Sequence, residues 1–268
     1  MPQPFLKWAG GKRHLIAQML PRLPERFGRY HEPFLGGGAL FFFLSPRLRR
    51  RHAYLADSNL RLVRTYLGLR AEPERVIQLL QNYPHDRAFF LEMRSRPIDQ
   101  QSDAEVAAWL IYLNKTAYNG LYRVNSRNVF NVPFGDYVRP NICDEPTLRA
   151  CAASLQHARI EQLDFEKAAS RAKPGDLVYF DPPYVPLSST SSFTSYTASG
   201  FGPDDQERLH DLALRLKRRG VHVLVSNSAT TAVRKLYKDF EGIAVVKARR
   251  SINSRPDQRG RISELLIW

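Results

Sequence analysis

The chain has 268 residues, 43% of them hydrophobic, so it is long enough for one large domain and apolar enough to bury a core. Lysine and arginine total 40 against 26 acidic residues, and the formal charge of +14 favours a polyanionic partner, nucleic acid above all, over a charge that serves solubility alone. Two cysteines and the lack of any apolar run near about 18 residues exclude a disulfide framework and a membrane span, and predict a cytoplasmic protein.

The first motif, residues 5–12 (FLKWAGGK), leads into an apolar-periodic segment from Leu15 to Leu20. A Gly-Gly turn followed by a lysine at a helix start suits an anionic group such as a carboxylate. The spacing of a Walker loop is missing, so the motif does not predict a nucleoside triphosphate site.

The second motif, residues 32–42 (EPFLGGGALFF), predicts a short extended segment, a glycine turn and an apolar helix. Glycines at a strand-to-helix turn let a ligand approach the backbone closely, and a plain packing turn is the alternative. The spacing Gly-x-Gly-x-x-Gly is absent, which argues against a nicotinamide or flavin cofactor.

A second strand is predicted over residues 53–59 and contains Asp57, about 20 residues after the glycine turn. From this position a carboxylate reaches the ribose hydroxyls of a bound nucleoside. Capping the helix that begins near Asn59 is an equally good local role, and one side chain can serve both.

Helical periodicity dominates the next part of the chain, with few strand signals. It runs through residues 60–69, 73–80, 88–94 and 104–118. A long helical insert between the strands of an α/β sheet is a natural place to bind a second substrate.

Residues 114–137 then carry turn signals at Asn119-Gly120 and at 126–128, and the segments 121–125 and 129–132 predict a hairpin. Aromatic, asparagine and arginine side chains interleave on it. That mixture favours a surface that reads and stacks on bases over a hairpin without a ligand.

After a helix near 145–155, a strand over 159–163 ends at Asp164-Phe165. Phe165 can lie against a purine while Asp164 accepts a hydrogen bond from its amine. The competing role for Asp164 is a helix cap.

Residues 176–184 (DLVYFDPPY) predict a buried strand that ends at Asp181, because two prolines forbid both its continuation and an immediate helix. Ligands bind at the carboxyl ends of parallel strands. Asp181 and the Pro182 carbonyl form an acceptor-only pair suited to an exocyclic amino group, and Tyr184 can stack on the ring that carries it. A strand followed by a plain Pro-Pro turn is the alternative.

The remaining elements complete an α/β body. A loop over 188–202 is predicted to be a lid ordered by substrate, and the basic segment 249–261 a hairpin tip near phosphates. The predicted elements are helices over 203–219 and 230–237 and strands over 221–226, 242–248 and 262–268.

In this order the motifs resemble the Dam-type DNA adenine N6-methyltransferases, which use S-adenosylmethionine, in the α arrangement of amino-methyltransferases. The resemblance covers nearly the whole chain and includes residues 186–188 and 192–194. It implies an α/β, Rossmann-like class I methyltransferase fold with a seven-stranded, mostly parallel sheet. Residues 1–59 and 138–268 would form the catalytic domain that binds the cofactor, and residues 60–137 a DNA-recognition insert with the hairpin.

The resemblance also implies roles for individual residues. The catalytic residues would be Asp181, Pro182, Pro183 and Tyr184. The cofactor would be surrounded by Trp8, Lys12, Phe34, Gly36, Asp57, Asp164, Phe165 and Asp181. Duplex DNA would be contacted by Lys7, Arg94, Tyr118, Asn119, Leu121, Arg123, Asn125, Asn131, Pro133 and Tyr137.

Within the family the recognition segment reads GATC, with Arg123 at a guanine edge, Tyr118 and Asn119 entering the duplex, Leu121 and Pro133 on bases and Arg94 on a phosphate. Asp136 departs from the pattern, because related enzymes often carry a basic residue there. The contact with DNA at that point is therefore expected to be weaker or rearranged.

The expected reaction is methyl transfer from S-adenosylmethionine to N6 of an adenine flipped out of double-stranded DNA, without a metal, by a protein that is monomeric in solution and associated with the nucleoid. Two alternatives stay open: an adenine methyltransferase with another recognition sequence, and a non-catalytic DNA-binding regulator of the same fold. Cytosine N4 methylation fits less well, since its motif usually begins with serine where Asp181 stands.

Overall fold

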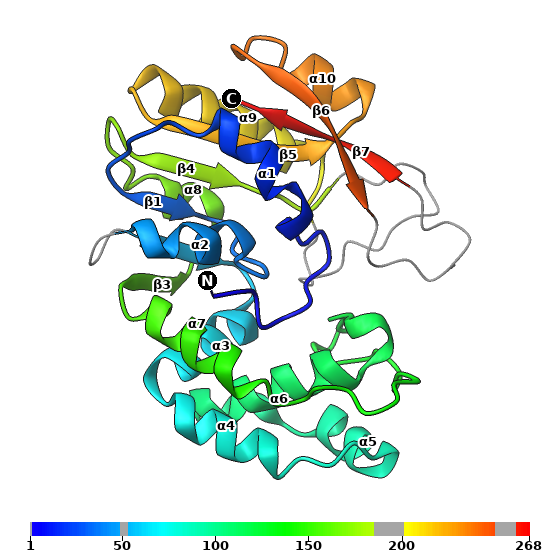
Figure 1. The fold of residues 1–268 in the computed structure, drawn as a ribbon. Coiled ribbons are helices and arrows are strands. Elements are labelled where there is room, and N and C mark those ends of the chain that lie inside the picture. The colour runs from blue at the N-terminus through cyan, green and yellow to red at the C-terminus, as the bar shows by residue number, and fades with distance from the viewer. Residues whose placement is uncertain (1, 49–52, 185–200, 250–260) are drawn as a thin grey trace.

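The computed structural model describes residues 2–48, 53–184, 201–249 and 261–268. Its centre is a seven-stranded sheet in the order β3-β2-β1-β4-β5-β7-β6 (Figure 1). The strands are β1 (Tyr30–Glu32), β2 (Ala53–Asp57), β3 (Ala158–Gln162), β4 (Leu177–Phe180), β5 (His222–Ser228), β6 (Ile243–Arg249) and β7 (Arg261–Ile267). Only β7 runs antiparallel to its neighbours, so the predicted seven-stranded, mostly parallel, Rossmann-like fold is confirmed.

The helices mostly follow the predicted segments. The α-helices are α1 (Ile16–Met19), α2 (Ala39–Leu44), α3 (Leu60–Ala71), α4 (Pro73–Gln81), α5 (Arg87–Ser95), α6 (Asp103–Thr116), α7 (Glu145–Leu155), α8 (Phe165–Ala169), α9 (Pro203–Arg218) and α10 (Thr231–Leu236). Short 3-10 helices are η1 (Arg13–Leu15), η2 (Leu20–Arg22), η3 (Ser45–Arg47), η4 (Ile98–Gln100) and η5 (Tyr118–Gly120).

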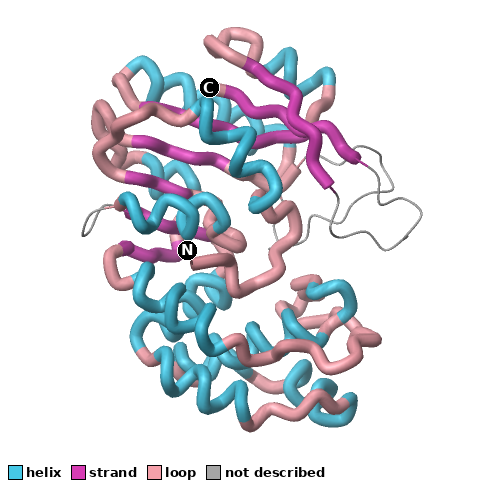
Figure 2. The backbone as a smooth tube through the Cα atoms, in the orientation of Figure 1, coloured by secondary structure: helices cyan, strands magenta, loops and turns pink. Residues whose placement is uncertain are grey.

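Both faces of the sheet are covered, and the alternation of side chains on β4 shows how. Val178 and Phe180 pack into the core formed with α8, α9 and α10, whereas Leu177 and Tyr179 join the larger core on the other face. Successive residues of a strand point to opposite faces, so a strand that is buried on both sides is apolar throughout. Figure 2 shows the strands between these helices and an all-helical part beside β3.

The helical part is built on α3, which packs on β2 and β3 and also on α4 and α6. Ion pairs bind α3 to η4 and to the start of α6: Arg61 to Asp99 at 2.6 Å and Arg64 to Asp103 at 2.5 Å. The predicted insert therefore begins at a helix that serves the sheet and the helical part together.

The predicted hairpin is only partly a β structure. Its two arms meet at one isolated antiparallel bridge, between Val124 and Phe130, instead of a ladder of paired strands. The Asn125 side-chain oxygen accepts from the amides of Arg127 and Val129, both at 3.0 Å, so the Val129 amide that a ladder would use is taken by a side chain. Asn128 completes the turn with a φ of 57°.

The predicted lid at 188–202 and the predicted basic tip at 249–261 lie almost wholly outside the described residues. The same holds for the motif segments 186–188 and 192–194.

Candidate active site

The acidic side chains singled out in the sequence meet at one edge of the sheet. Asp57 is the last residue of β2 and Asp181 follows β4, while β1 lies between these two parallel strands. The glycine turn at 36–38 follows β1 at the same edge. These motifs therefore lie at the carboxyl ends of parallel strands, the edge at which ligands bind in open α/β sheets.

Asp181 is paired with Lys12, whose Nζ lies 2.9 Å from Asp181 Oδ1. The lysine is 3% exposed and the Asp181 side chain 20% exposed, so the pair is shielded but open on the aspartate side. Burial raises the pKa of Asp181 to about 6, and the attraction of Lys12 opposes that rise. At neutral pH Asp181 is therefore an ionised acceptor held by a buried cation.

Tyr184 and Glu264 complete what we call the edge cluster, together with Lys12 and Asp181. The Tyr184 hydroxyl donates to Glu264 Oε2 at 2.5 Å, and the Lys12 ammonium lies 4.6 Å from the centre of the Tyr184 ring. Glu264 comes from β7 and was not predicted from the sequence. An acidic residue in the apolar run of β7 was the only signal that could have found it.

The loop after Asp181 is also held by side chains of α9 and β5. Gln206 of α9 donates to the Pro183 carbonyl at 3.4 Å and accepts from Asn227 of β5 at 2.9 Å. Because a proline cannot donate, the loop offers its carbonyls to partners.

A second buried acid lies behind the cluster. Glu32, at the end of β1, accepts a hydrogen bond from the Tyr30 hydroxyl at 2.9 Å. Burial raises the pKa of Glu32 to about 8, so it is mostly protonated at neutral pH. This spares the edge a further negative charge beside Asp57 and Asp181.

The glycine turn is fixed by Asp57 and Trp8. Asp57 accepts from the amides of Gly36 at 3.0 Å and Asn59 at 2.9 Å, while Asn59 is the residue that caps α3. Gly36 has a φ of 47°, and a Cβ there would lie 2.9 Å from Trp8 Cδ1. Only glycine suits both conditions, so the turn brings backbone and indole into close contact.

Phe34 and Phe165 also come together, with ring centres 5.3 Å apart. Phe201 packs on both, and the Arg208 guanidinium lies 4.9 Å from the Phe165 ring centre. Asp164 caps α8 by accepting from the Glu166 amide at 2.9 Å, which is the competing role anticipated for it.

The predicted DNA-contacting residues form two groups. In the first, Asn114 at the end of α6 joins the N-terminal segment to the Asn119-Gly120 turn. Its side-chain oxygen accepts from the Lys7 backbone N–H at 2.8 Å. Its side-chain nitrogen donates to the carbonyls of Lys7 at 2.7 Å and Gly120 at 2.9 Å. Asn119 itself has a φ of 55°. The sequence did not single out Asn114 as the tie between these segments.

Tyr118, Leu121, Pro133 and Tyr137 surround the same turn. The Tyr118 amide donates to the Pro133 carbonyl at 2.9 Å, and Tyr137 is hydrogen-bonded to the Gly120 backbone. Tyr118 and Pro133 are exposed. The neighbouring Val138 is 94% exposed and was not predicted as a contact.

The second group lies along the hairpin. Arg123 is exposed, and its Nε donates to Asn131 Oδ1 at 2.8 Å, so the guanidinium is held in one direction. The oxygen of Asn125 is used by the turn. Arg94 stands apart, in the last turn of α5.

Tyr122 connects the hairpin with the sheet edge. Its ring stacks on Trp8 at a centre-to-centre distance of 5.4 Å, and its hydroxyl interacts with Arg61. Arg61 also donates to the carbonyl of Asn128, in the hairpin turn, at 2.7 Å. The predicted cofactor site at the sheet edge and the predicted DNA-contacting hairpin are therefore joined by continuous side-chain contacts.

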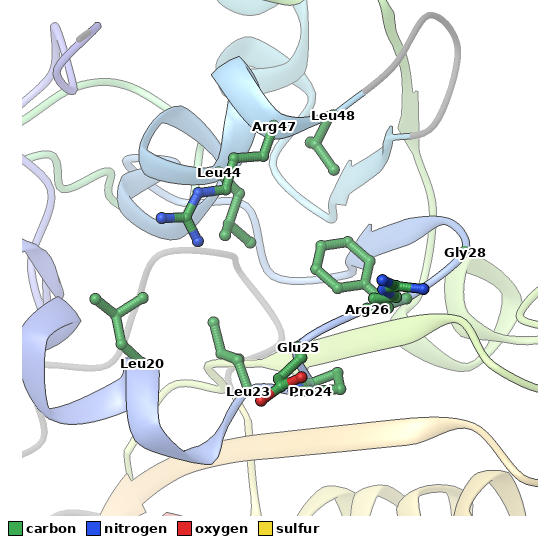
Figure 3. Close-up of a pocket in the computed structure, with 10 residues that line it drawn as sticks. Leu20, Leu23, Pro24, Glu25, Arg26, Gly28, Leu44, Arg47 and Leu48 are labelled. Carbon is green, nitrogen blue, oxygen red and sulfur yellow. The ribbon is translucent and has the colours of Figure 1, made fainter.

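A pocket of about 900 Å³ opens at the opposite edge of the sheet (Figure 3). It is lined by Leu20, Leu23, Pro24, Glu25, Arg26, Phe27, Gly28, Leu44, Arg47 and Leu48. Gly28 precedes β1, so this pocket lies at the amino ends of the parallel strands and has no part in the edge cluster.

The strand order with its single reversed strand, and the acidic groups at the carboxyl edge, define a Rossmann-like methyltransferase. The family model of the D12 class N6 adenine-specific DNA methyltransferases matches residues 8–252, and the chain belongs to this family. The enzyme is thus an adenine-specific DNA methyltransferase, which needs a methyl donor and acts on DNA. Within the described residues no helix is long and apolar enough to cross a membrane.

Curated relatives match over the full length. A type II methyltransferase, M1.LlaDCHI of Lactococcus lactis, is 42% identical, and the match covers 99% of this chain and 94% of the relative. M.MjaIII of Methanocaldococcus jannaschii, also a type II methyltransferase, is 38% identical, with 99% and 98% covered. The DNA adenine methylase of Vibrio cholerae is 38% identical, with 98% and 94% covered.

Proposed function

We propose that the enzyme transfers a methyl group from S-adenosylmethionine to N6 of an adenine flipped out of duplex DNA, within the sequence GATC. The observation that carries this proposal is the placement of Asp181. It is a partly buried, ionised acceptor at a strand end, its partner Lys12 lies over the Tyr184 ring, and the edge is joined through Trp8 and Tyr122 to the hairpin and the Asn119-Gly120 turn, which we call the recognition surface.

The residues at the sheet edge fit the cofactor. Asp57 uses one lone pair of each oxygen on backbone amides, and the remaining lone pairs can accept from ribose hydroxyls. The tight turn at Gly36 exposes backbone that a cofactor can approach closely, and the Trp8 indole packs against this turn. Lys12 is the cation suited to a carboxylate. When bound, S-adenosylmethionine supplies a methyl group on a sulfonium, which is a good leaving group.

A purine can stack on the Phe165 ring only if a neighbouring side chain moves. The ring is only 5% exposed and is covered by Phe34, Phe201 and the Arg208 guanidinium. We infer that one of these neighbours gives way when the adenine of the cofactor stacks there, while Asp164 accepts from its amine.

Asp181 acts on the target amine. The N6 lone pair of adenine is delocalised into the ring, so the amine is a poor nucleophile. Hydrogen bonds from N6 to Asp181 and to the Pro182 carbonyl favour a more tetrahedral nitrogen as its bond to the methyl group forms. Pro183 keeps this loop rigid, and the transfer is a displacement in which positioning contributes most. The methylated nitrogen then releases one of its two protons to water.

Tyr184 holds the flipped base. Extrusion from the duplex costs a few kcal/mol, and stacking on an aromatic ring returns about 1–3 kcal/mol. Burial raises the pKa of the Tyr184 phenol well above its ordinary value, so the phenol stays protonated and keeps its donor role toward Glu264.

The recognition surface reads the sequence. Arg123, held by Asn131, presents its guanidinium to a guanine edge, and Asn125 lies beside it in the turn. Tyr118 and Asn119 enter the duplex. Contacts with DNA are also assigned to Lys7, Arg94, Leu121, Pro133 and Tyr137.

The same proposal divides the chain into a catalytic part, 1–59 and 138–268, and a recognition insert, 60–137, in a protein that works as a monomer in the nucleoid. A different recognition sequence is the second candidate, which the acidic Asp136 specifically favours, since it repels phosphate where related enzymes often attract it.

The test is methylation by purified protein, with labelled S-adenosylmethionine, of duplexes that are identical except at one GATC site, followed by nucleoside analysis. N6-methyladenine confined to the GATC duplex is expected. Label on both duplexes would keep the reaction and overturn the sequence assignment. No transfer despite binding of cofactor and DNA would favour a regulator.

A further inference from the structure

Glu264 is a buried carboxylate on β7, an interior strand of the sheet. It is 3% exposed, and it pairs with Ser228 of β5 on one side and Val246 of β6 on the other. Its neighbour Leu265 faces the core with α9 and α10, so the alternation of the strand directs Glu264 to the other face. A buried carboxylate is costly unless charged or hydrogen-bonding partners compensate it.

Both partners of Glu264 belong to the edge cluster. Its Oε2 accepts from the Tyr184 hydroxyl at 2.5 Å and lies 3.8 Å from Lys12 Nζ. Lys12 is also the ion-pair partner of Asp181 at 2.9 Å. The lysine therefore stands between two carboxylates, and only one of them, Asp181, lies where a substrate amine would need it.

We propose that Glu264 is a positioning residue for the reaction, an inference that rests on the proposed function. It fixes the plane of the Tyr184 ring through the phenol, so that the ring is in place when the base arrives. It also gives Lys12 a second carboxylate, so that Asp181 can turn its oxygen from the lysine to the N6 hydrogen without leaving a buried cation uncompensated.

A merely structural Glu264 would only neutralise Lys12 and would not act through Tyr184. The two roles are separated by a double-mutant cycle with Glu264→Gln, which keeps the shape and an acceptor but removes the charge, and Tyr184→Phe, which keeps the ring and removes the phenol. Tyr112→Phe is the matched control, because Tyr112 is a buried tyrosine whose hydroxyl donates to the Pro84 carbonyl at 3.0 Å, away from the cluster.

The readouts are the single-turnover rate with saturating cofactor and DNA, the KM for DNA, and the fluorescence of a duplex with 2-aminopurine at the target adenine. We expect each cluster variant to slow single turnover about tenfold, as the loss of a charge-assisted hydrogen bond would, and the double variant to be no slower than about twice the worse single. We expect KM for DNA to change little and the 2-aminopurine fluorescence to report a flipped base that is more mobile than in the wild type. Tyr112→Phe should keep the wild-type rate.

Independent, multiplying effects of the two substitutions, or an unchanged rate in Glu264→Gln, would overturn the positioning role. If Glu264→Gln does not fold, as judged by its melting temperature, Tyr184→Phe decides alone: a wild-type rate refutes the role and a slowed rate with an unchanged KM supports it. Failure of the wild-type enzyme to form N6-methyladenine would refute the proposed function instead, so the two failures are distinguishable.

Discussion

Under the proposed function Asp181 and Arg123 both present a charge to the substrate, yet their surroundings differ. Asp181 lies in the edge cluster, where it pairs with a buried lysine that a second carboxylate, Glu264, also faces. Arg123 lies on an exposed hairpin and has the side chain and backbone of Asn131 as partners. If these roles hold, the group that acts on the reacting atom is preorganised in a shielded site, whereas the group that reads a base is held by one partner on the surface.

The largest effect is expected from Asp181→Ala. The variant should lose methyl transfer because no acceptor remains for the N6 hydrogens, while circular dichroism shows an intact fold. Asp181→Asn, which keeps the shape, should be inactive too. Retained turnover in either variant would remove Asp181 from the chemistry and with it the contrast between the two regions.

Arg123→Ala should weaken discrimination at one guanine by about 1–3 kcal/mol, because a bidentate contact to a base edge is lost. The measurement compares kcat/KM on the GATC duplex with that on duplexes altered at a single base pair. Arg127→Ala, on the same turn and equally exposed, is the control. An unchanged sequence preference in Arg123→Ala would refute its reading role.

The pH dependence should separate the two regions as well. With a pKa of about 6, Asp181 loses its charge below that pH, so the single-turnover rate should fall about tenfold per unit of pH there. DNA binding at the hairpin, which depends on an arginine, should not follow this fall.

Stability should move in the opposite direction. Burial raises the pKa of Asp181 in the folded state, so its ionisation costs stability: its contribution is fully present below the unfolded pKa and is lost as pH rises through about 6. Asp181→Ala should remove this component from the stability profile measured by denaturant unfolding. A single-turnover rate that stays constant down to pH 5 would contradict the requirement for an ionised Asp181.

The smallest effect is expected from Asp136→Lys on the recognition surface. Removing a negative charge and adding a positive one should strengthen DNA binding a few-fold and steepen the dependence of log K on log salt by about one. The rate of the chemical step should not change. No change in the salt slope would place Asp136 away from the DNA.

The sequence predicted those features that neighbouring residues determine. The run 176–184 fixed the Asp181 strand end, because proline geometry is local, and the apolar alternation with its breaks located most helices and strands. Glu264 was missed because its partner Tyr184 is 80 positions away, and no periodicity marks such a contact. The role of Asn114 was not predicted for the same reason, since its partner Lys7 lies 107 positions earlier.

The hairpin shows a different limit. Its residues favour strands, but the Asn125 side chain takes the amides of the turn and leaves a single bridge. Side-chain competition for backbone donors depends on the geometry of the turn, which the order of residues alone does not give.

The central claim is that chemistry and reading belong to separate residues of one connected site. Its most direct test is the binding of the inactive Asp181→Ala enzyme to two duplexes that differ by one base pair in GATC, with the affinities compared at one salt concentration. We predict that the ratio of the two dissociation constants matches that of the wild type. A preference that disappears together with the transfer would contradict it.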